Sequence, residues 1–327
     1  MQKVIVTIDV EGHVGDDPVN KLIYGITEDG QRAGIDGIID LLDEYQIKGL
    51  FFVDVAEAWH FGEDKIADVL MYIKERGHDI GVHIHPDHMM DKNKLFLSEY
   101  TYDEQYEIIK KCTDFYEKVL HEKPIAFRAG KYGANRDTLT IISELGYKLD
   151  FSQFYGQKWC HIKPPITKVS VAKVTNNLYE IPVSSYMSFN KKFYSRFDKL
   201  DASLPYKEFK YVFEHMIDNS SYEVMVLFAH SFSFLNWRKN PNKVKFSKKL
   251  YQRFYRQIEY AKSSDKVEFL TLKELLVTLE KENKVIPENQ IEKNGTISSW
   301  LFLIKRAIGV LQARIDIKIS ESVKKVK

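Results

Sequence analysis

Segments with the pattern of a β-strand alternate with segments with the pattern of a helix along most of the chain, and this alternation limits the folds open to it. Residues 3–9 (KVIVTID) and 223–229 (EVMVLFA) are β-branched or apolar runs typical of buried strands. Residues 35–45 (IDGIIDLLDEY) place apolar side chains at helical spacing. About seven such β-then-α units predict an α/β fold with a parallel sheet and helical crossovers. Closing units of this kind gives a (β/α) barrel.

The composition is that of a globular protein of 327 residues, with 44% hydrophobic and 29% charged residues. The formal net charge of +2 gives no case for a nucleic-acid partner. Two cysteines, Cys112 and Cys160, suggest no disulfide framework, and neither belongs to a Cys-x-x-Cys metal pair. The N-terminus leads straight into a strand without the features of an export signal, and no run approaches the roughly 20 apolar residues of a membrane span. We therefore expect a cytoplasmic protein.

Two stretches depart from the alternation. Residues 152–222 are rich in Tyr, Phe and Ser, and we interpret them as an elaboration over the site of a catalytic barrel that spans residues 1–284; a separate small domain is the alternative. Residues 285–327 form a polar linker and then a basic, apolar tail. The core of this tail, WLFLIKRAI at 300–308, is too short and too charged to cross a bilayer. We expect a helical tail that lies on an anionic membrane, packs on a protein partner or docks on its own barrel.

Polar and charged residues gather where the predicted strands end. Barrel enzymes carry their chemistry at the carboxyl ends of the strands. A chance scatter would place as many polar residues at the strand starts, so the asymmetry predicts an enzyme. The residues at or just past these ends are Asp9, Glu11, His83, His85, Arg128, Asp150 and His230.

Residues 77–88 (GHDIGVHIHPDH) hold the densest group of metal-ligand side chains. His83 and His85 stand two positions apart on an extended segment, so both point to one face, as chelation of one cation requires. With the acids that follow the first strand, these imidazoles fit metal-assisted hydrolysis, in which a divalent ion polarises a carbonyl and lowers the pKa of a bound water. In such a site a carboxylate removes the water's proton, a histidine protonates the leaving nitrogen and an arginine keeps the base ionised.

These residues also resemble the motifs of the polysaccharide deacetylase (NodB-homology) family, a group of metal-dependent carbohydrate de-N-acetylases with a distorted (β/α) barrel. Residues 7–12 (TIDVEG) are similar to the first motif, Thr-Phe-Asp-Asp-Gly, in the form of an outlying Asp-x-Glu branch. The resemblance implies that Asp9 is the catalytic base and Glu11 a metal ligand. Residues 77–83 are similar to the family segment Gly-His-Glu-Ile-Gly-x-His, which makes His83 a metal ligand.

Two later motifs complete the resemblance, which covers roughly residues 3–282. The segment FRAGKY is similar to the arginine motif, which implies that Arg128 orders the base and that Tyr132 lines the substrate groove. The segment LFAH is similar to the last motif, whose histidine, here His230, is the general acid. Asp150 lies in a segment that also resembles the family, and we expect it to contact the substrate.

The identity of the third metal ligand stays open. The family places its second metal histidine four residues after the first, and this chain has Asp87 there. A His-x-His-Pro pattern favours His85, the smallest displacement from the family spacing favours His88, and Asp87 itself is a third candidate. The family often uses zinc, which we expect here, although three nitrogen and oxygen ligands also accept cobalt, nickel or manganese.

The resemblance implies an N-deacetylase of an acetamido sugar, which we expect to be a nucleotide- or lipid-linked intermediate of surface polysaccharide biosynthesis. Two other readings are a metal-dependent hydrolase of a non-sugar, cyclic amide on the same scaffold and a carbohydrate-binding protein without turnover. The joint presence of a base, an arginine and a general acid weighs against the last. Lys131 is expected to contact the substrate. Basic residues that follow strands on this face either meet a phosphate or form a solvated rim, and they are Lys131, Arg136, Arg238 and Lys239.

Overall fold

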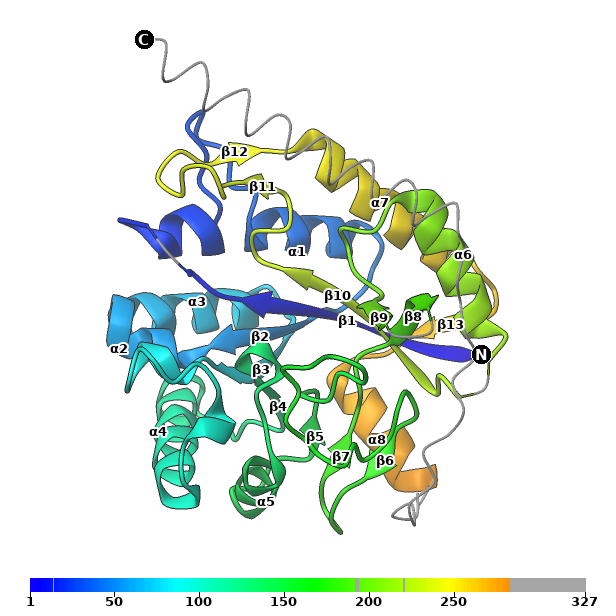
Figure 1. Cartoon of the computed structure of the whole chain (residues 1–327). Coiled ribbons are helices and arrows are strands. Elements are labelled where there is room, and N and C mark those ends of the chain that lie inside the picture. The colour runs from blue at the N-terminus through cyan, green and yellow to red at the C-terminus, as the bar shows by residue number, and fades with distance from the viewer. Residues whose placement is uncertain (14, 192–193, 220, 283–327) are drawn as a thin grey trace.

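The computed structural model describes residues 1–13, 15–191, 194–219 and 221–282, and a nine-stranded sheet lies at its centre (Figure 1). The strands of this sheet are β1 (Gln2–Val10), β2 (Leu50–Asp54), β3 (Asp79–Ile84), β4 (Ala126–Ala129), β5 (Leu149–Asp150), β6 (Ala172–Lys173), β7 (Tyr179–Glu180), β10 (Val224–His230) and β13 (Val267–Phe269). Their order is β10-β1-β2-β3-β4-β5-β7-β6, and β13 pairs with the start of β1. Neighbouring strands run parallel except for β6, which is antiparallel to β7.

The sheet curls into a half barrel, which confirms the predicted α/β class and the distorted (β/α) barrel. Every strand expected from the sequence is present, although β5 and β7 keep only two paired residues each. Beyond the sheet, Asp201 forms an isolated parallel bridge with Phe228 of β10. Part of the elaboration at residues 152–222 therefore lies against the edge strand β10.

Helices connect most of the parallel strands, as the sequence pattern predicts. They are α1 (Ile35–Glu44), α2 (Ala58–Phe61), α3 (Glu63–Glu75), α4 (Tyr102–Leu120), α5 (Arg136–Glu144), α6 (Tyr206–Ile217), α7 (Lys248–Lys262) and α8 (Leu272–Glu282). Single 3-10 or π turns lie at Val19–Ile23, Val55–Glu57, Pro86–His88, Leu97–Glu99 and Gly130–Tyr132. Helix α4 begins with a capping box, in which the Glu104 carboxylate accepts a 2.8 Å hydrogen bond from the backbone N–H of Thr101.

The side chains of β1 show how the core leads to the site. Val4, Val6 and Ile8 face the helices and belong to the large core cluster. Ile5 points to the other face, into a smaller cluster of apolar residues inside the curled sheet. On that inner face Thr7 and Asp9 follow Ile5, so the filling of the half barrel changes from apolar to polar toward the carboxyl end.

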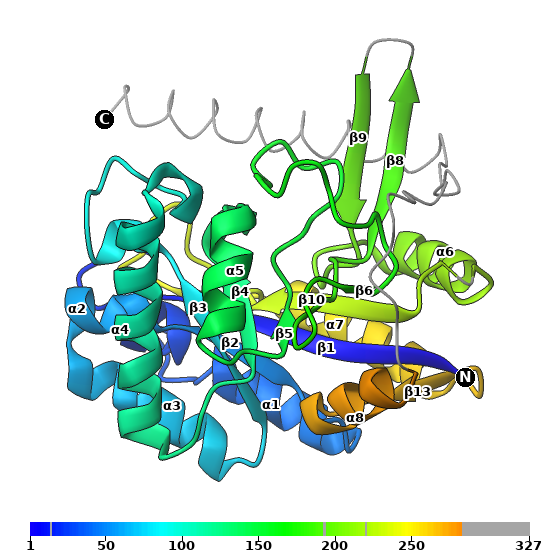
Figure 2. The same cartoon turned by 90° about the horizontal axis from the view of Figure 1, so that it is seen from below.

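Residues 152–222 contain more regular structure than the sequence pattern indicates. Strands β8 (Ser185–Lys191) and β9 (Tyr194–Lys199) pair antiparallel into a hairpin that projects away from the sheet (Figure 2). The sequence interpretation missed α6, although its buried Phe209, Val212, Phe213 and Met216 have helical spacing. Whether this region is an elaboration of the barrel or a separate domain stays a prediction.

The predictions for the tail concern residues 285–327, which lie outside the described residues, as does the proposed domain boundary at 284. They stay predictions. In the part of the chain that the structure describes, no helix is both long and apolar enough to cross a membrane.

Candidate active site

The site forms at the carboxyl ends of β1, β3, β4 and β10, because parallel register places these ends side by side. Asp9 of β1 pairs with His230 of β10, and His83 of β3 pairs with Arg128 of β4. The residues that follow β1 and β3 by one position add a carboxylate and an imidazole. All of these side chains are buried except the half-buried His230. The predicted site residues that the structure brings together are Asp9, Glu11, His83, His85, Arg128 and His230.

Glu11, His83 and His85 form a group whose ligand atoms all lie within 4.8 Å of one another. From Oε2 of Glu11, Nε2 of His85 is 2.9 Å away and Nε2 of His83 is 3.7 Å away. Nδ1 of His83 donates a 2.8 Å hydrogen bond to the carbonyl oxygen of Arg128, which leaves Nε2 free to bind a metal. Burial alone would raise the pKa of Glu11, but His85 and His83 hold it well below its usual range. One carboxylate and two imidazoles are a donor set suited to zinc and similar ions.

The position of His85 depends on the loop that follows β4. A Cβ atom at Gly130 would lie 2.8 Å from carbon atoms of the His85 ring and 2.7 Å from the carbonyl oxygen of Ile84. These distances are too short for a side-chain carbon, so only glycine lets the loop pack this closely on the ring. Gly130 therefore makes room for an imidazole two residues after His83.

His88 lies in a second group, with Asp54 and Glu57. Nδ1 of His88 is 2.9 Å from Oδ2 of Asp54, the last residue of β2. The same carboxylate accepts a 3.1 Å hydrogen bond from the backbone N–H of His85, so it connects the two groups. Burial and the nearby Asp54 raise the pKa of Glu57 well above its usual value. Of the candidates for the third ligand, the geometry thus favours His85 over His88.

Asp9 and Arg128 form a buried ion pair beside the metal-ligand group. Nη1 of Arg128 donates to Oδ1 of Asp9, and Nη2 donates to Thr7 Oγ1 at 3.0 Å. The remaining donor of the guanidinium, Nε, is 3.3 Å from the carbonyl oxygen of Phe151. Burial alone would raise the pKa of Asp9, but Arg128 and His83 hold it below its usual value. An ionised carboxylate is thus fixed with its free oxygen 3.9 Å from Nε2 of His83.

After Asp9, His230 is the second residue of the site that could transfer a proton. Its Nε2 lies 3.6 Å from Oε1 of Glu11, and its side chain is 30% exposed. The ring stacks on Phe232, with centroids 4.8 Å apart and planes inclined by 17°. Burial lowers the pKa of His230 to about 4, against the opposing effect of Glu11. His230 is therefore a neutral, partly accessible imidazole at neutral pH in this structure.

Comparisons with known proteins bear on the fold and on the family that the chain resembles. The family model described as polysaccharide deacetylase matches residues 16–149, a region that contains His83, His85 and Arg128. Two solved structures assigned as polysaccharide deacetylases, from Mycobacterium smegmatis and from Pseudomonas aeruginosa PAO1, are similar to 89% and 86% of this chain. The match to the family model and the two structures support a likeness to polysaccharide deacetylases, over part of the chain in sequence and over most of it in fold. The match to this model indicates a hydrolase that acts on amide bonds.

The structural similarity is broad but distant in sequence. The M. smegmatis structure has a TM-score of 0.57 at 16% identity with 94% of that chain covered, and the P. aeruginosa structure has 0.53 at 11% identity with 91% covered. The structure of PuuE allantoinase is also similar, with a TM-score of 0.51 and 13% identity over 85% of this chain and 90% of that one. At such identities the likeness shows the fold alone. No curated protein matches the chain at a significant level.

Two expected substrate contacts lie on a strained turn after β4. Lys131 and Tyr132 have φ angles of 52° and 59°, a region that non-glycine residues rarely adopt and that often marks functional sites. The Tyr132 hydroxyl accepts a 2.8 Å hydrogen bond from Nζ of Lys199, and its ring packs edge-on against Phe154. Nζ of Lys131 lies 3.8 Å from Asp87. The roles of Lys131 and Tyr132 as substrate contacts stay predictions.

Asp150 lies in the core and not at the surface of the site. Its side chain is fully buried, and Oδ1 accepts a 2.6 Å hydrogen bond from Ser152 Oγ. Glu180 of the neighbouring β7 lies beside it, and burial raises the pKa of both carboxyls, so the pair retains at least one proton. The structure therefore does not support direct substrate contact by Asp150, because Ser152 and Glu180 cover it.

The sequence interpretation missed Lys199 and Asp54. No sequence pattern pointed to Lys199, whereas Asp54 stands at the end of a strand. Lys199, at the end of β9, lies 3.8 Å from Asp201 and 3.1 Å above the ring of Phe228, and burial lowers its pKa to about 8. It lies in a region without strand and helix alternation, so no pattern pointed to it. Asp54, by contrast, ends a predicted strand, which is the signal that identified the other site residues.

His13 was also missed, because a single histidine in a polar loop carries no pattern. Its Nε2 lies 3.4 Å from Oε1 of Glu11, and its ring stacks on Trp237 with centroids 5.8 Å apart. Its φ angle of 58° is a further left-handed conformation at the site. His13 thus links the metal-ligand group to the loop that follows β10.

Proposed function

We propose that this chain removes the N-acetyl group from an acetamido sugar by metal-dependent hydrolysis. The observation that carries the proposal is the convergence of a three-residue ligand group with an ionised carboxylate and a partly exposed imidazole. Glu11, His83 and His85 offer one oxygen and two nitrogen ligands, which fits a catalytic zinc site with three protein ligands and an open position. A divalent ion held there polarises the acetyl carbonyl and activates water.

The remaining residues supply the proton transfers. Asp9 is the base, because Arg128 and His83 keep its carboxylate ionised, so it accepts a proton from the attacking water. His230 is neutral before the reaction and partly exposed, so it takes up a proton from solvent and donates it to the sugar nitrogen as the carbon–nitrogen bond breaks, and the proton on Asp9 then returns to solvent. Arg128 is a positioning residue, because its guanidinium donors are already bound inside the protein.

We also propose a cytoplasmic, nucleotide- or lipid-linked acetamido sugar, an intermediate of surface polysaccharide biosynthesis, as the substrate. Its anionic linkage is supported by the basic residues near His230 that are described below. Fractionation of cells that express the full chain tests the location, and recovery of the enzyme outside the cytoplasm and its membrane surface would contradict it.

Metal analysis combined with acetate release tests the proposed reaction. The purified full chain is expected to bind about one divalent ion and to release acetate from at least one member of a panel of acetamido sugars. A chelator should abolish this release, and added zinc should restore it. A metal-loaded enzyme that releases no acetate from the panel but opens a cyclic amide would assign the chain to the amidohydrolase alternative.

A further inference from the structure

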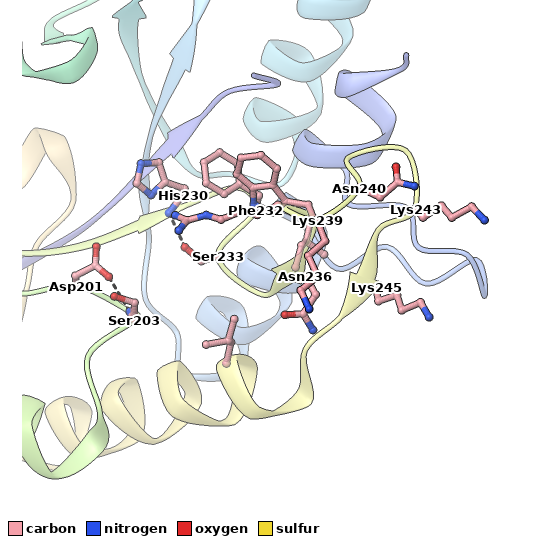
Figure 3. A pocket seen from close by; sticks show the side chains of 14 residues that line it. Asp201, Ser203, His230, Phe232, Ser233, Asn236, Lys239, Asn240, Lys243 and Lys245 are labelled. Carbon is pink, nitrogen blue, oxygen red and sulfur yellow. Dashed lines mark hydrogen bonds between the residues drawn. The ribbon is translucent and has the colours of Figure 1, made fainter. Parts of the chain in front are cut away.

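A cavity of about 880 Å³ lies next to His230, within the usual size range of small-molecule sites (Figure 3). Most of its walls come from the segment between the end of β10 and the start of α7. Figure 3 shows His230 and Asp201 at one end, Lys243 and Lys245 at the other, and Lys239 between them. The cavity therefore extends from the proposed general acid to a group of lysines.

The wall far from His230 is basic. Its cationic residues are Arg238, Lys239, Lys243 and Lys245. Asp201, at the His230 end, is the one acid among the lining residues. Lys245 lies 3.7 Å from Glu28, but within the described part of the chain the other three cations have no carboxylate within 4.0 Å. Positive charge is thus concentrated in this pocket without being neutralised by the protein.

The loop that carries these cations has a fixed shape. Strands β11 (Leu235–Asn236) and β12 (Lys245–Phe246) pair antiparallel at its base. Under the loop, Leu235 and Val244 pack with Phe232 in a small apolar cluster of their own. At its tip, Oδ1 of Asn242 accepts a 2.9 Å hydrogen bond from the backbone N–H of Asp16. The backbone that carries the cations is therefore held in place, and their side chains are exposed to a ligand.

We propose that this pocket binds the phosphate or diphosphate group of a substrate whose acetamido sugar lies at His230. The inference rests on the proposed deacetylase function and specifies its substrate class. A neutral glycan gives no reason for three cations without a carboxylate partner to line the cavity that begins at the general acid. A phosphate ester carries the matching charge, and lysine and arginine bind phosphate oxygens through charge-assisted hydrogen bonds. Sugars linked to a nucleotide and sugars linked to a lipid carrier share this chemistry.

The test compares substrates that differ only in the anomeric substituent. The full-length, metal-loaded enzyme is given N-acetylglucosamine as a methyl glycoside, as a 1-phosphate, as a nucleoside diphosphate sugar and as a polyprenyl diphosphate sugar in detergent. The same set is given to the double variant Lys239→Gln, Lys243→Gln. The matched control is Lys248→Gln, Lys249→Gln, because these two lysines are exposed at the start of α7 and do not line the cavity.

The phosphorylated sugars should have a kcat/KM at least about tenfold above that of the methyl glycoside, and added salt should reduce this preference. In the pocket variant the preference should fall about tenfold or more, mainly through KM, while the control keeps it. A higher kcat/KM for the nucleotide or for the lipid form identifies the natural carrier. Equal kcat/KM for the neutral and phosphorylated sugars in the wild-type enzyme would overturn the pocket and leave the deacetylase function standing.

Calorimetry with the nucleoside diphosphate alone separates the two proposals. Wild type and control should bind it at least about tenfold more tightly than the pocket variant, whether or not any sugar is deacetylated. If this difference holds and no acetamido sugar is hydrolysed, the phosphate pocket stands and the proposed reaction fails. Equal binding by wild type and pocket variant would reject the pocket.

Discussion

The two ends of β3 carry histidines that differ in their protonation and in their partners. His78 precedes the strand at its amino end, His83 lies near its carboxyl end, and both are buried. Burial lowers the pKa of His78 to about 4. Burial alone would also lower the pKa of His83, but Asp9 and Glu11 raise it to about 9. The surroundings therefore disfavour positive charge at His78 and favour it at His83, where a bound metal ion would supply that charge.

The contrast follows from what each end of the sheet faces. At the amino end, polar side chains satisfy backbone groups: Nδ1 of His78 accepts from the N–H of Gly49 at 3.0 Å, and Asp79 accepts from the N–H of Leu272 at 2.8 Å. Helix α8 packs its Leu275 into the apolar cluster inside the half barrel. At the carboxyl end, buried titratable groups face one another instead. A buried ionisable residue therefore stabilises backbone groups at the amino end of the sheet, whereas at the carboxyl end it belongs to the group proposed to carry out the reaction.

Substitution of a metal ligand at the carboxyl end should reduce metal content and activity far more than substitution of His78 at the amino end. Glu11→Ala and His83→Ala each delete a donor of the three-residue group, so the bound ion and at least about 10²-fold of the activity should be lost. His78→Asn keeps an acceptor near the Gly49 N–H and should keep the metal. Metal content per folded protein and acetate release measure both effects. Full metal occupancy in the Glu11 and His83 variants would show that the carboxyl end is not the metal site.

Replacing the base should separate chemistry from metal binding. Asp9→Asn removes the negative charge next to Arg128 without removing any member of the ligand group, so the variant should keep the ion. Its kcat should fall by about 10²–10⁴, the usual contribution of a positioned base. Parallel measurement of kcat and metal content checks this. A near-normal rate in Asp9→Asn would assign the base to another carboxylate, with Asp87 as the next candidate.

The third ligand should distinguish His85 from His88. His85→Ala removes an Nε2 that is 2.9 Å from Glu11, so it should abolish tight metal binding. His88 binds Asp54 through Nδ1, and Asp54 in turn holds the backbone of His85, so His88→Ala should weaken the metal by only about 10–100-fold. Titration of the metal-free variants with zinc measures both affinities. The opposite order of effects would make His88 the ligand and His85 its support.

The sequence allowed prediction of those features that depend on local patterns. The strands and most helices have clear periodicity. Asp9, His83 and His230 could be predicted as site residues because they lie near the ends of strands whose parallel register brings those ends together. Lys199 could not be predicted, because it reaches the site at the end of a hairpin that forms a separate two-stranded sheet outside the alternation of strands and helices. The burial of Asp150 was not foreseen, because the position of a residue at a strand end does not reveal how deeply it lies, and its role as a substrate contact stays a prediction.

The smallest expected effect is on how the free energy of unfolding depends on pH through His78, at the amino end of β3. An unfolded chain protonates His78 near pH 6.5, whereas the folded chain does so only near pH 4. Between these values the unfolded state binds more protons, so folding should weaken as the pH falls. Lowering the pH from 7.5 to 5 should therefore cost the wild type about 1 to 2 kcal/mol through this residue. His78→Asn cannot titrate at this position, so its free energy of unfolding in urea, measured without metal, should fall by correspondingly less over the same pH range.

His121→Asn, which changes an exposed histidine in a left-handed position that asparagine tolerates, serves as the matched control and should follow the wild type. Identical pH profiles for wild type and His78→Asn would mean that the amino-end histidine is not held neutral by the fold, and the contrast between the two ends of β3 would then rest on the carboxyl end alone.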